Sequence, residues 1–254
     1  MDITSFSREE INKGLELAKS KRTGTSETVR LLFSPFNVNE SNINEVFDLY
    51  SNLEKNDFDS VVVVEAHPGS SEKKLPMPSF KSVSTSLGEV VANDKLRNDF
   101  CDEDDDFFID DAAFDDDVSL YNQLMLLQCS LDDFTILSIQ LTDEGSFTVK
   151  ELAYALEEIL AQKNALIVFC CELNSEHREE FEQVIQLYDN DNMTGLMNYL
   201  NSGESSIDGV SAFISGLIVA KKWGLKLNFG ESSANKNKNL LTGFAELQRQ
   251  PIVR

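Results

Sequence analysis

The chain has 254 residues, of which 41% are hydrophobic and 9% aromatic, which is enough for a folded α/β domain with a buried core. Asp and Glu number 44 against 22 Lys and Arg, so the formal net charge is -22. A charge of this sign and size repels nucleic acid and anionic membranes, and we expect neither as a partner.

The sequence also lacks the signals of a membrane or secreted protein. No run of about 18 uninterrupted apolar residues occurs, so no membrane-spanning helix is expected, and the N-terminal stretch has no apolar core of a secretory signal. The cysteines Cys101, Cys129, Cys170 and Cys171 form no zinc-type CxxC pair. These observations favour a reducing, cytoplasmic location.

The N-terminal part of the chain alternates between helix and strand patterns. Ser7 and Glu10 predict a capping box at the start of a first helix. Residues 28–36 predict a strand, and Ser41 predicts the cap of the next helix. The segment 58–67 contains an unbroken apolar run, which is typical of a strand that is covered on both faces.

Two loops are predicted next, separated by a turn and a helix over residues 87–100. Residues 68–87 contain three of the five prolines, and residues 101–117 contain ten acidic residues and no basic one. The acidic run lacks the glycine and the closing glutamate of an EF-hand loop, so we interpret it as solvated. We predict one domain over residues 1–254, with 68–86 and 101–117 as loop insertions whose order is left open.

The remainder of the chain continues the alternation. A second capping box is predicted at Thr148 and Glu151. Helices and strands are predicted at 119–128, 134–142, 165–173, 205–224, 225–229 and 240–248. The alternation predicts an α/β fold, a three-layer domain with a mainly parallel central sheet. In such sheets ligands bind beyond the carboxyl ends of the strands, and here those ends are Pro35–Phe36, Glu65–His67, Thr142 and Glu172–Asn174.

Only two histidines are available to a catalytic or metal site there, His67 and His177. A Cys/His zinc site or a two-histidine iron site therefore has little material. His177 follows strand 165–173 and is expected near the same strand ends, but a histidine at a helix end is more commonly a solvated cap. No GxGxxG, GxxxxGK[ST], GxSxG or HExxH motif occurs.

Several stretches, read in order, resemble the Memo family. The segment TSLGEVVANDKLRNDF is similar to the family's TPLGEV-type segment, and ALIVFCCELNS to the strand that ends in SSDFSH. DDAAFDDDVSLYNQLMLLQ resembles the segment that contains EHS, and SSIDGVSAFISG the helix that begins with ICG. The resemblance implies kinship with AmmeMemoRadiSam system protein B and the fold of class III extradiol dioxygenase catalytic subunits.

The resemblance also implies that the family's metal site is largely lost. At the matching positions, Phe36 and Val118 replace histidines, His67 is retained, Glu172 replaces an aspartate and Asp208 replaces a cysteine. A further family histidine falls near Ser175, or on His177 if two residues are inserted. Phenylalanine cannot donate to a metal ion, and one histidine with carboxylates makes a weaker site for a transition metal. Loss of the histidine at Val118 also removes a proton carrier.

We therefore favour a non-catalytic Memo-like protein, with a binding or scaffold role and no cofactor. The remnant crevice would be formed by Phe36, His67, Val118, Glu172, His177 and Asp208, and would take a peptide or protein. The alternative is a metal-dependent oxidoreductase or hydrolase in which His67, Glu172 and Asp208 hold a divalent metal ion. Convergence of these three side chains distinguishes the two hypotheses; the oligomeric state is left open.

Overall fold

A six-stranded sheet forms the centre of the computed structural model, which describes residues 2–22, 28–69, 71–114, 119–229 and 240–248. The strand order is β10-β12-β1-β8-β2-β7. The strands are β1 (Val29–Ser34), β2 (Ser60–Ala66), β7 (Thr135–Leu141), β8 (Ala165–Cys170), β10 (Lys226–Phe229) and β12 (Gly243–Glu246). β1, β8, β2 and β7 run parallel, whereas β12 runs antiparallel to both β1 and β10.

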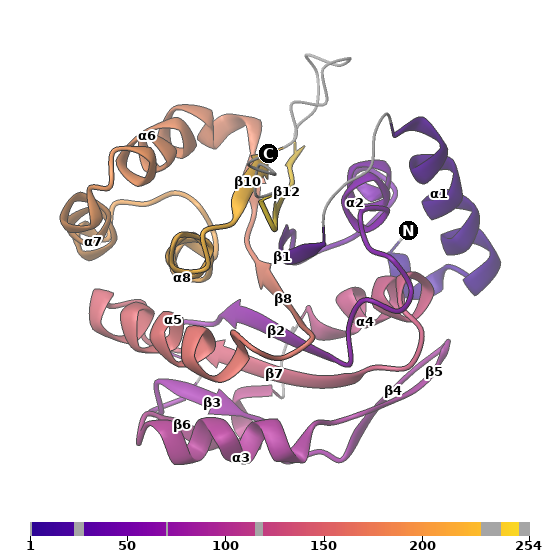
Figure 1. Cartoon of the computed structure of the whole chain (residues 1–254), viewed down its shortest axis with the longest axis horizontal. Coiled ribbons are helices and arrows are strands. Elements are labelled where there is room, and N and C mark those ends of the chain that lie inside the picture. The colour runs from indigo at the N-terminus through magenta and orange to yellow at the C-terminus, as the bar shows by residue number, and fades with distance from the viewer. Residues whose placement is uncertain (1, 23–27, 70, 115–118, 230–239, 249–254) are drawn as a thin grey trace, which may run out of the picture.

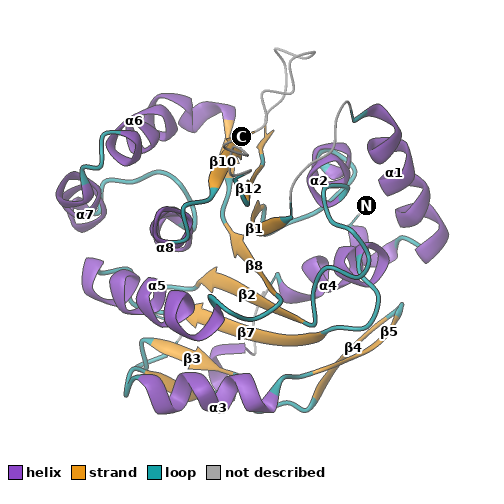
Figure 2. Cartoon of the chain, viewed as in Figure 1, coloured by secondary structure: helices purple, strands orange, loops and turns teal. Residues whose placement is uncertain are grey.

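Helices cover both faces of this sheet (Figures 1 and 2). One face packs against α1 (Arg8–Lys21), α2 (Ile43–Tyr50) and α4 (Leu120–Ser130). The other packs against α5 (Ser146–Leu160), α6 (Arg178–Asp189), α7 (Met193–Ser202) and α8 (Val210–Lys222). The predicted α/β fold with a mainly parallel sheet between two helical layers is confirmed. No helix in the described ranges is long and apolar enough to cross a bilayer.

The apolar run of β2 explains why this strand lies at the centre. Val61 and Val63 point into the hydrophobic cluster on the α4 side, and Val62 and Val64 point into the cluster on the α8 side. Because successive side chains of a strand face opposite ways, an unbroken run is stable only where both faces are buried. On the α8 side, ring contacts among Phe33, Phe169, Phe181, Phe213 and Phe229 fill the core.

The two segments that were predicted as loops carry short strands, so that prediction was wrong. Within 68–86 and 101–117, β3 (Leu75–Met77) pairs in parallel with β6 (Phe107–Ile109). A hairpin of β4 (Ser82–Thr85) and β5 (Gly88–Val91) lies between them in sequence and leads through Ala92 to the outer edge of β7. These strands have three or four residues each, which is too short for a period of two to be recognised.

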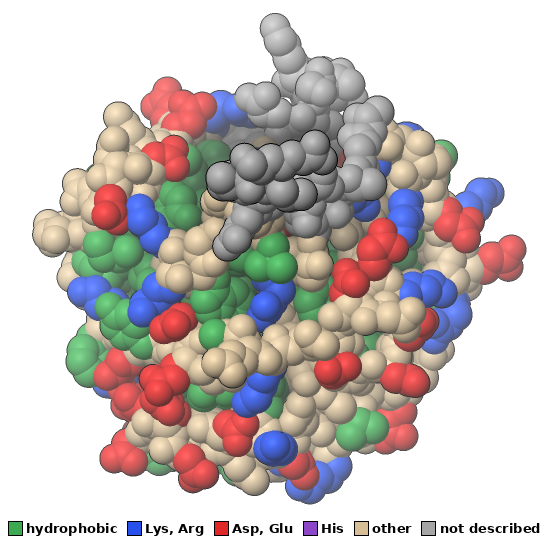
Figure 3. Space-filling model, in the orientation of Figure 1, with side chains coloured by type: hydrophobic (Ala, Val, Ile, Leu, Met, Phe, Trp, Pro, Cys, Tyr) green, Lys and Arg blue, Asp and Glu red, His purple; other side chains and the backbone are tan. Residues whose placement is uncertain are grey.

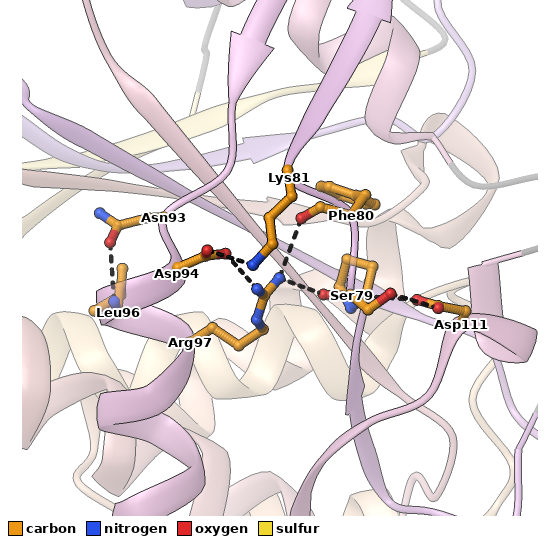
Figure 4. A network of polar contacts seen from close by, with 9 residues as sticks. Ser79, Phe80, Lys81, Asn93, Asp94, Leu96, Arg97 and Asp111 are labelled. Carbon is orange, nitrogen blue, oxygen red and sulfur yellow. Dashed lines mark hydrogen bonds and ion pairs between the residues drawn. The ribbon is translucent and has the colours of Figure 1, made fainter.

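A buried arginine joins these short strands to α3 (Asp94–Glu103), as Figure 4 shows. The guanidinium of Arg97 donates to the carbonyl oxygens of Pro78 at 2.7 Å and Phe80 at 3.2 Å, and it also pairs with Asp94. Nearby, Asp111 accepts hydrogen bonds from the backbone N–H and the hydroxyl of Ser79, both at 2.6 Å. Polar contacts thus add to the burial of Pro78 and the packing of Phe80 in holding residues 78–81 in place.

The helix starts agree only partly with the predicted caps. The capping box of Ser7 and Glu10 is confirmed. Ser41 does not cap α2, because its hydroxyl donates to Asn39 and the residue at the cap position is Asn42. The box at Thr148 is also wrong: α5 begins at Ser146, and the Thr148 hydroxyl donates to Asp143 at 2.8 Å. The apolar helix predicted over 205–224 begins only at Val210.

Candidate functional site

A cavity of about 800 Å³ lies at the carboxyl ends of β1, β2 and β8, where the fold class places ligand sites. We call it the strand-end cavity. Its walls come from residues that follow these strands, from the start of α4, from the 144 turn, from the loop 203–210 and from the N-terminus. The lining residues include Asp2, Phe36, Asn37, His67, Ser119, Tyr121, Asn122, Glu144, Glu172, Ser205, Asp208 and Gly209.

The structure brings four of the six sequence-predicted residues to this cavity. Phe36, His67, Glu172 and Asp208 line it. Val118 lies outside the described residues. His177 is not among the lining residues; it ends a short 3-10 helix (Ser175–His177) before α6, with its Nδ1 buried and without a hydrogen-bond partner. The expectation that His177 faces the strand-end cavity is therefore wrong.

His67 is held from behind by a buried carboxylate. Its Nε2 lies 3.2 Å from Oε2 of Glu65, whose side chain is fully buried. The same Oε2 accepts the backbone N–H of Ser119 at 2.8 Å. Oε1 of Glu65 has no hydrogen-bond partner in the described structure. The ring of Phe36 meets the imidazole edge to face, with centroids 6.3 Å apart, so the imidazole of His67 is fixed on two sides.

Glu172 organises the backbone around it. Its Oε1 accepts the backbone N–H of Phe36 at 3.0 Å, and its own N–H donates to the carbonyl oxygen of Asp208 at 2.9 Å. Burial raises the pKa of Glu172, the backbone N–H groups of Asn37 and Phe36 lower it, and nearby Asp208 raises it; the net shift is upward. Glu172 therefore links the end of β1 to the loop before α8.

Gly209 allows this loop to approach the sheet. Its φ is +77°, and a Cβ atom there would lie 2.6 Å from the carbonyl oxygen of Cys170 and 2.8 Å from Cζ of Phe36. Any side chain at this position would collide with backbone, in a conformation that glycine adopts most readily. The close contact keeps Asp208 at the cavity wall.

A row of polar side chains lies under the cavity, on the α4 face of the sheet. Ser34, Cys170, Glu65 and Gln140 take neighbouring positions on β1, β8, β2 and β7, and all four are fully buried. The hydroxyl of Ser119 donates to the sulfur of Cys170 at 3.2 Å. Neither polar atom of the Gln140 amide has a partner in the described structure. The α4 face of the sheet is thus polar near the carboxyl ends of its strands, although the sequences of these strands are mainly apolar.

A comparison with protein-family models identifies the family of the chain. The family model described as Memo-like protein matches residues 7–240 of the chain. The chain belongs to the Memo-like family. A search of the curated proteins finds no match.

The residues of this Memo-like chain do not fit a transition-metal site at the strand-end cavity. Within the described residues, one group of three or more His, Cys, Asp or Glu side chains has ligand atoms that all lie within 4.8 Å of one another, namely Asp104, Asp106 and Glu151. His67, Glu172 and Asp208 form no such group. A catalytic metal ion needs about three converging protein ligands, which these side chains do not provide.

The acidic group on the β6 side has a lysine beside it and a carboxyl group with a raised pKa. The ammonium of Lys74 lies 2.8 Å from Oδ2 of Asp106. Burial raises the pKa of Glu151 to about 7, and its hydrogen bond with Asp106 and the charges of Asp104 and Asp106 add to this rise. A pKa of about 7 leaves Glu151 partly protonated at neutral pH, which lessens the repulsion among the three carboxylates. Two of these carboxylates come from the segment that the sequence indicated was solvated.

Sequence reasoning missed Glu65, Tyr121, Glu144 and Asp2 as residues of the site. Glu65 had a usable signal, because it is the one charged residue within the apolar run of β2. A charged residue is almost never fully buried without a partner, so its position two residues before His67 predicts a contact. Glu144 and Asp2 had no such signal, since the fold brings them in from distant loops.

Glu180 on α6 fixes the loop that forms one wall of the cavity. Its Oε1 accepts the hydroxyl of Ser205 at 2.6 Å and the backbone N–H of Ser206 at 3.1 Å. Burial raises the pKa of Glu180, but the hydrogen bonds from Ser205, Ser206 and Tyr199 outweigh it and lower the pKa to about 2. The ionised form of Glu180 therefore stabilises the folded conformation of the loop that contains Ser205 and Ser206.

We expect Glu180→Gln to destabilise the protein by about 1–2 kcal/mol at pH 7, because hydrogen bonds to a charged acceptor become bonds to a neutral one. A lowered folded-state pKa stabilises above the unfolded value of 4.5, and this stabilisation is lost as the pH falls towards about 2. The difference between variant and parent should therefore shrink from pH 6 to pH 3 in urea unfolding. Glu179→Gln, at the exposed neighbouring position, is the control; an equal effect there would refute the role of Glu180.

Proposed function

We propose that this Memo-like protein is a non-catalytic binding or scaffold protein, and that its strand-end cavity receives part of a peptide or protein partner. The observation that carries the proposal is the separation of His67, Glu172 and Asp208, which share no common ligand position. A volume of about 800 Å³ is within the range of pockets that bind organic ligands.

Each former ligand position has another role in this proposal. Phe36 contributes an apolar wall where the resemblance implies a histidine. Glu172 satisfies backbone N–H groups at the end of β1, and Glu65 orients His67. The exposed side chains of Tyr121 and Asp208 are then the groups that a partner would touch first. A fold persists more readily than a function during divergence, so a protein keeps the fold of its family after the metal-binding residues have been replaced.

Two further assignments, the origin of the cavity and the cellular location of the protein, belong to the same proposal. We propose that the cavity descends from a metal site like that of AmmeMemoRadiSam system protein B and of class III extradiol dioxygenase catalytic subunits, on the strength of the motif order in the sequence. A cytoplasmic location is supported by the four unpaired cysteines. The alternative of a metal-dependent oxidoreductase or hydrolase requires His67, Glu172 and Asp208 to converge, and no observation favours it.

Metal content tests the proposal directly. Protein purified without chelator, and protein incubated with Fe(II), Zn(II) or Cu(II) and then desalted, should hold well below one ion per chain by elemental analysis. His67→Ala should leave that content unchanged, because a lone imidazole with distant carboxylates binds these ions weakly. His177→Ala, outside the cavity, is the matched control. Stoichiometric metal that His67→Ala removes and His177→Ala retains would overturn the non-catalytic proposal.

A further inference from the structure

The charges around the strand-end cavity are almost all of one sign. Asp2, Glu144, Glu172 and Asp208 line it. His67 is the one basic side chain among the described lining residues, which include no lysine or arginine. Low-dielectric walls concentrate the field of such charges inside a cavity.

These carboxylates are not neutralised by cations of the protein. Asp2 accepts from Thr4, Glu144 accepts the hydroxyl of Ser211 at 3.0 Å, and Glu172 accepts backbone N–H groups. All these donors are neutral. Within the described residues, no ion pair involves any of the four lining carboxylates.

A second and independent observation concerns Glu65, which lies behind the lining residues His67 and Ser119. Glu65 is fully buried, and its Oε1 has no hydrogen-bond partner in the described structure. Its other oxygen contacts His67 and Ser119, both of which line the cavity. Buried polar atoms are nearly always satisfied, so the unpaired oxygen places uncompensated negative charge density directly behind His67 and Ser119.

Two features act in the opposite direction, and they are smaller. The N-terminus of α8 at Gly209 and Val210 contributes about half a positive charge, and protonated His67 contributes at most one. Four lining carboxylates and Glu65 outweigh them. An anionic ligand such as a phosphate would therefore be repelled, whereas a cation would be attracted.

Aromatic side chains add a surface that suits an organic cation. Tyr121 is 48% exposed and lines the cavity together with Phe36. Guanidinium and ammonium groups bind to aromatic faces. A bare metal ion would not use these rings, would not fill about 800 Å³, and would need carboxylates that converge.

We infer that the strand-end cavity binds the guanidinium or ammonium side chain of a basic peptide segment, with Glu172 and Asp208 as its carboxylate partners. The inference rests on the proposed function and names the chemistry of the partner. Glu172 is fixed by the N–H of Phe36, so it meets the cation without losing much conformational freedom.

Calorimetric titration with two peptides whose termini are blocked and therefore uncharged tests the inference. The first is N-acetyl-Gly-Ser-Arg-Ser-Gly-amide, and the second has citrulline in place of arginine, which keeps the shape and removes the charge. The arginine peptide should bind at least tenfold more tightly than the citrulline peptide. Glu172→Gln combined with Asp208→Asn should weaken the arginine peptide at least tenfold, while thermal melting shows that the variant is folded.

The net charge of -22 attracts any cation, so a control must carry two fewer negative charges elsewhere. Figure 3 shows carboxylates spread among lysine and arginine over the described part of one face, without a single dominant patch. Glu16→Gln combined with Glu158→Gln, at exposed positions on α1 and α5, should change the affinity less than twofold. An equal loss in this control, or no binding of the arginine peptide at millimolar concentration, would overturn the inference. Equal binding of both peptides would also overturn it but leave the proposed binding role intact.

Discussion

Replacing Gly209 with alanine is expected to destabilise the protein by about 3 kcal/mol, since two separate costs add. A φ of +77° costs a residue with a Cβ atom about 1 kcal/mol or more. The new methyl group would also lie 2.6 Å from the Cys170 carbonyl oxygen and 2.8 Å from Cζ of Phe36. Overpacking of this kind costs about 1–3 kcal/mol, and here the collision is with backbone, which cannot move aside alone.

Gly224→Ala separates the two costs of Gly209→Ala. Gly224 has a φ of +60°, and an added Cβ atom there would meet nothing within 4 Å. This variant should lose only the conformational part, about 1 kcal/mol. Urea unfolding of both variants gives the comparison. Equal losses would mean that the close approach of Gly209 to β8 contributes nothing, and the account of the cavity wall would be wrong.

The same contact explains which parts of the site the sequence could reveal. Residues after strands were predictable, because parallel strands end on one edge and their next residues meet there. Phe36, His67 and Glu172 come together for this reason. Asp208 reaches them only because Gly209 lets its loop pass close to Cys170, which is a tertiary contact without a local pattern.

The polar row under the cavity was harder to predict for a physical reason. Glu65 and Gln140 are each the second-to-last residue of a buried strand, and there a lone polar residue in the sequence resembles the start of the loop. Only the strand order and register place them side by side. His177 shows the reverse error, because nearness to a strand end in sequence does not determine which way the next helix turns.

Arg97→Met is expected to destabilise the protein by about 3 kcal/mol. The side chain of Arg97 is 5% exposed, and its guanidinium supplies hydrogen bonds to the carbonyl oxygens of Pro78 and Phe80 (Figure 4). Methionine replaces the apolar stem of Arg97 but is shorter and donates nothing, so both carbonyl groups lose this donor. The cost is about 1–3 kcal/mol for the buried Pro78 carbonyl and less for the part-buried Phe80 carbonyl. Urea unfolding at pH 7 measures the loss.

The loss should be concentrated in the segment that the sequence did not identify as structured. β3, β4 and β6 are short and lie outside the six-stranded sheet, so their local stability depends on the polar contacts of Arg97 as well as on the burial of Leu75, Met77 and Phe107. Hydrogen exchange of residues 75–91 should rise more than that of β2 in Arg97→Met. Lys81→Met removes an ion pair to the same Asp94, but its side chain is 75% exposed, and so it should cost less than about 1 kcal/mol. If the two variants change exchange of 75–91 equally, the buried carbonyl contacts are not what holds this segment to α3.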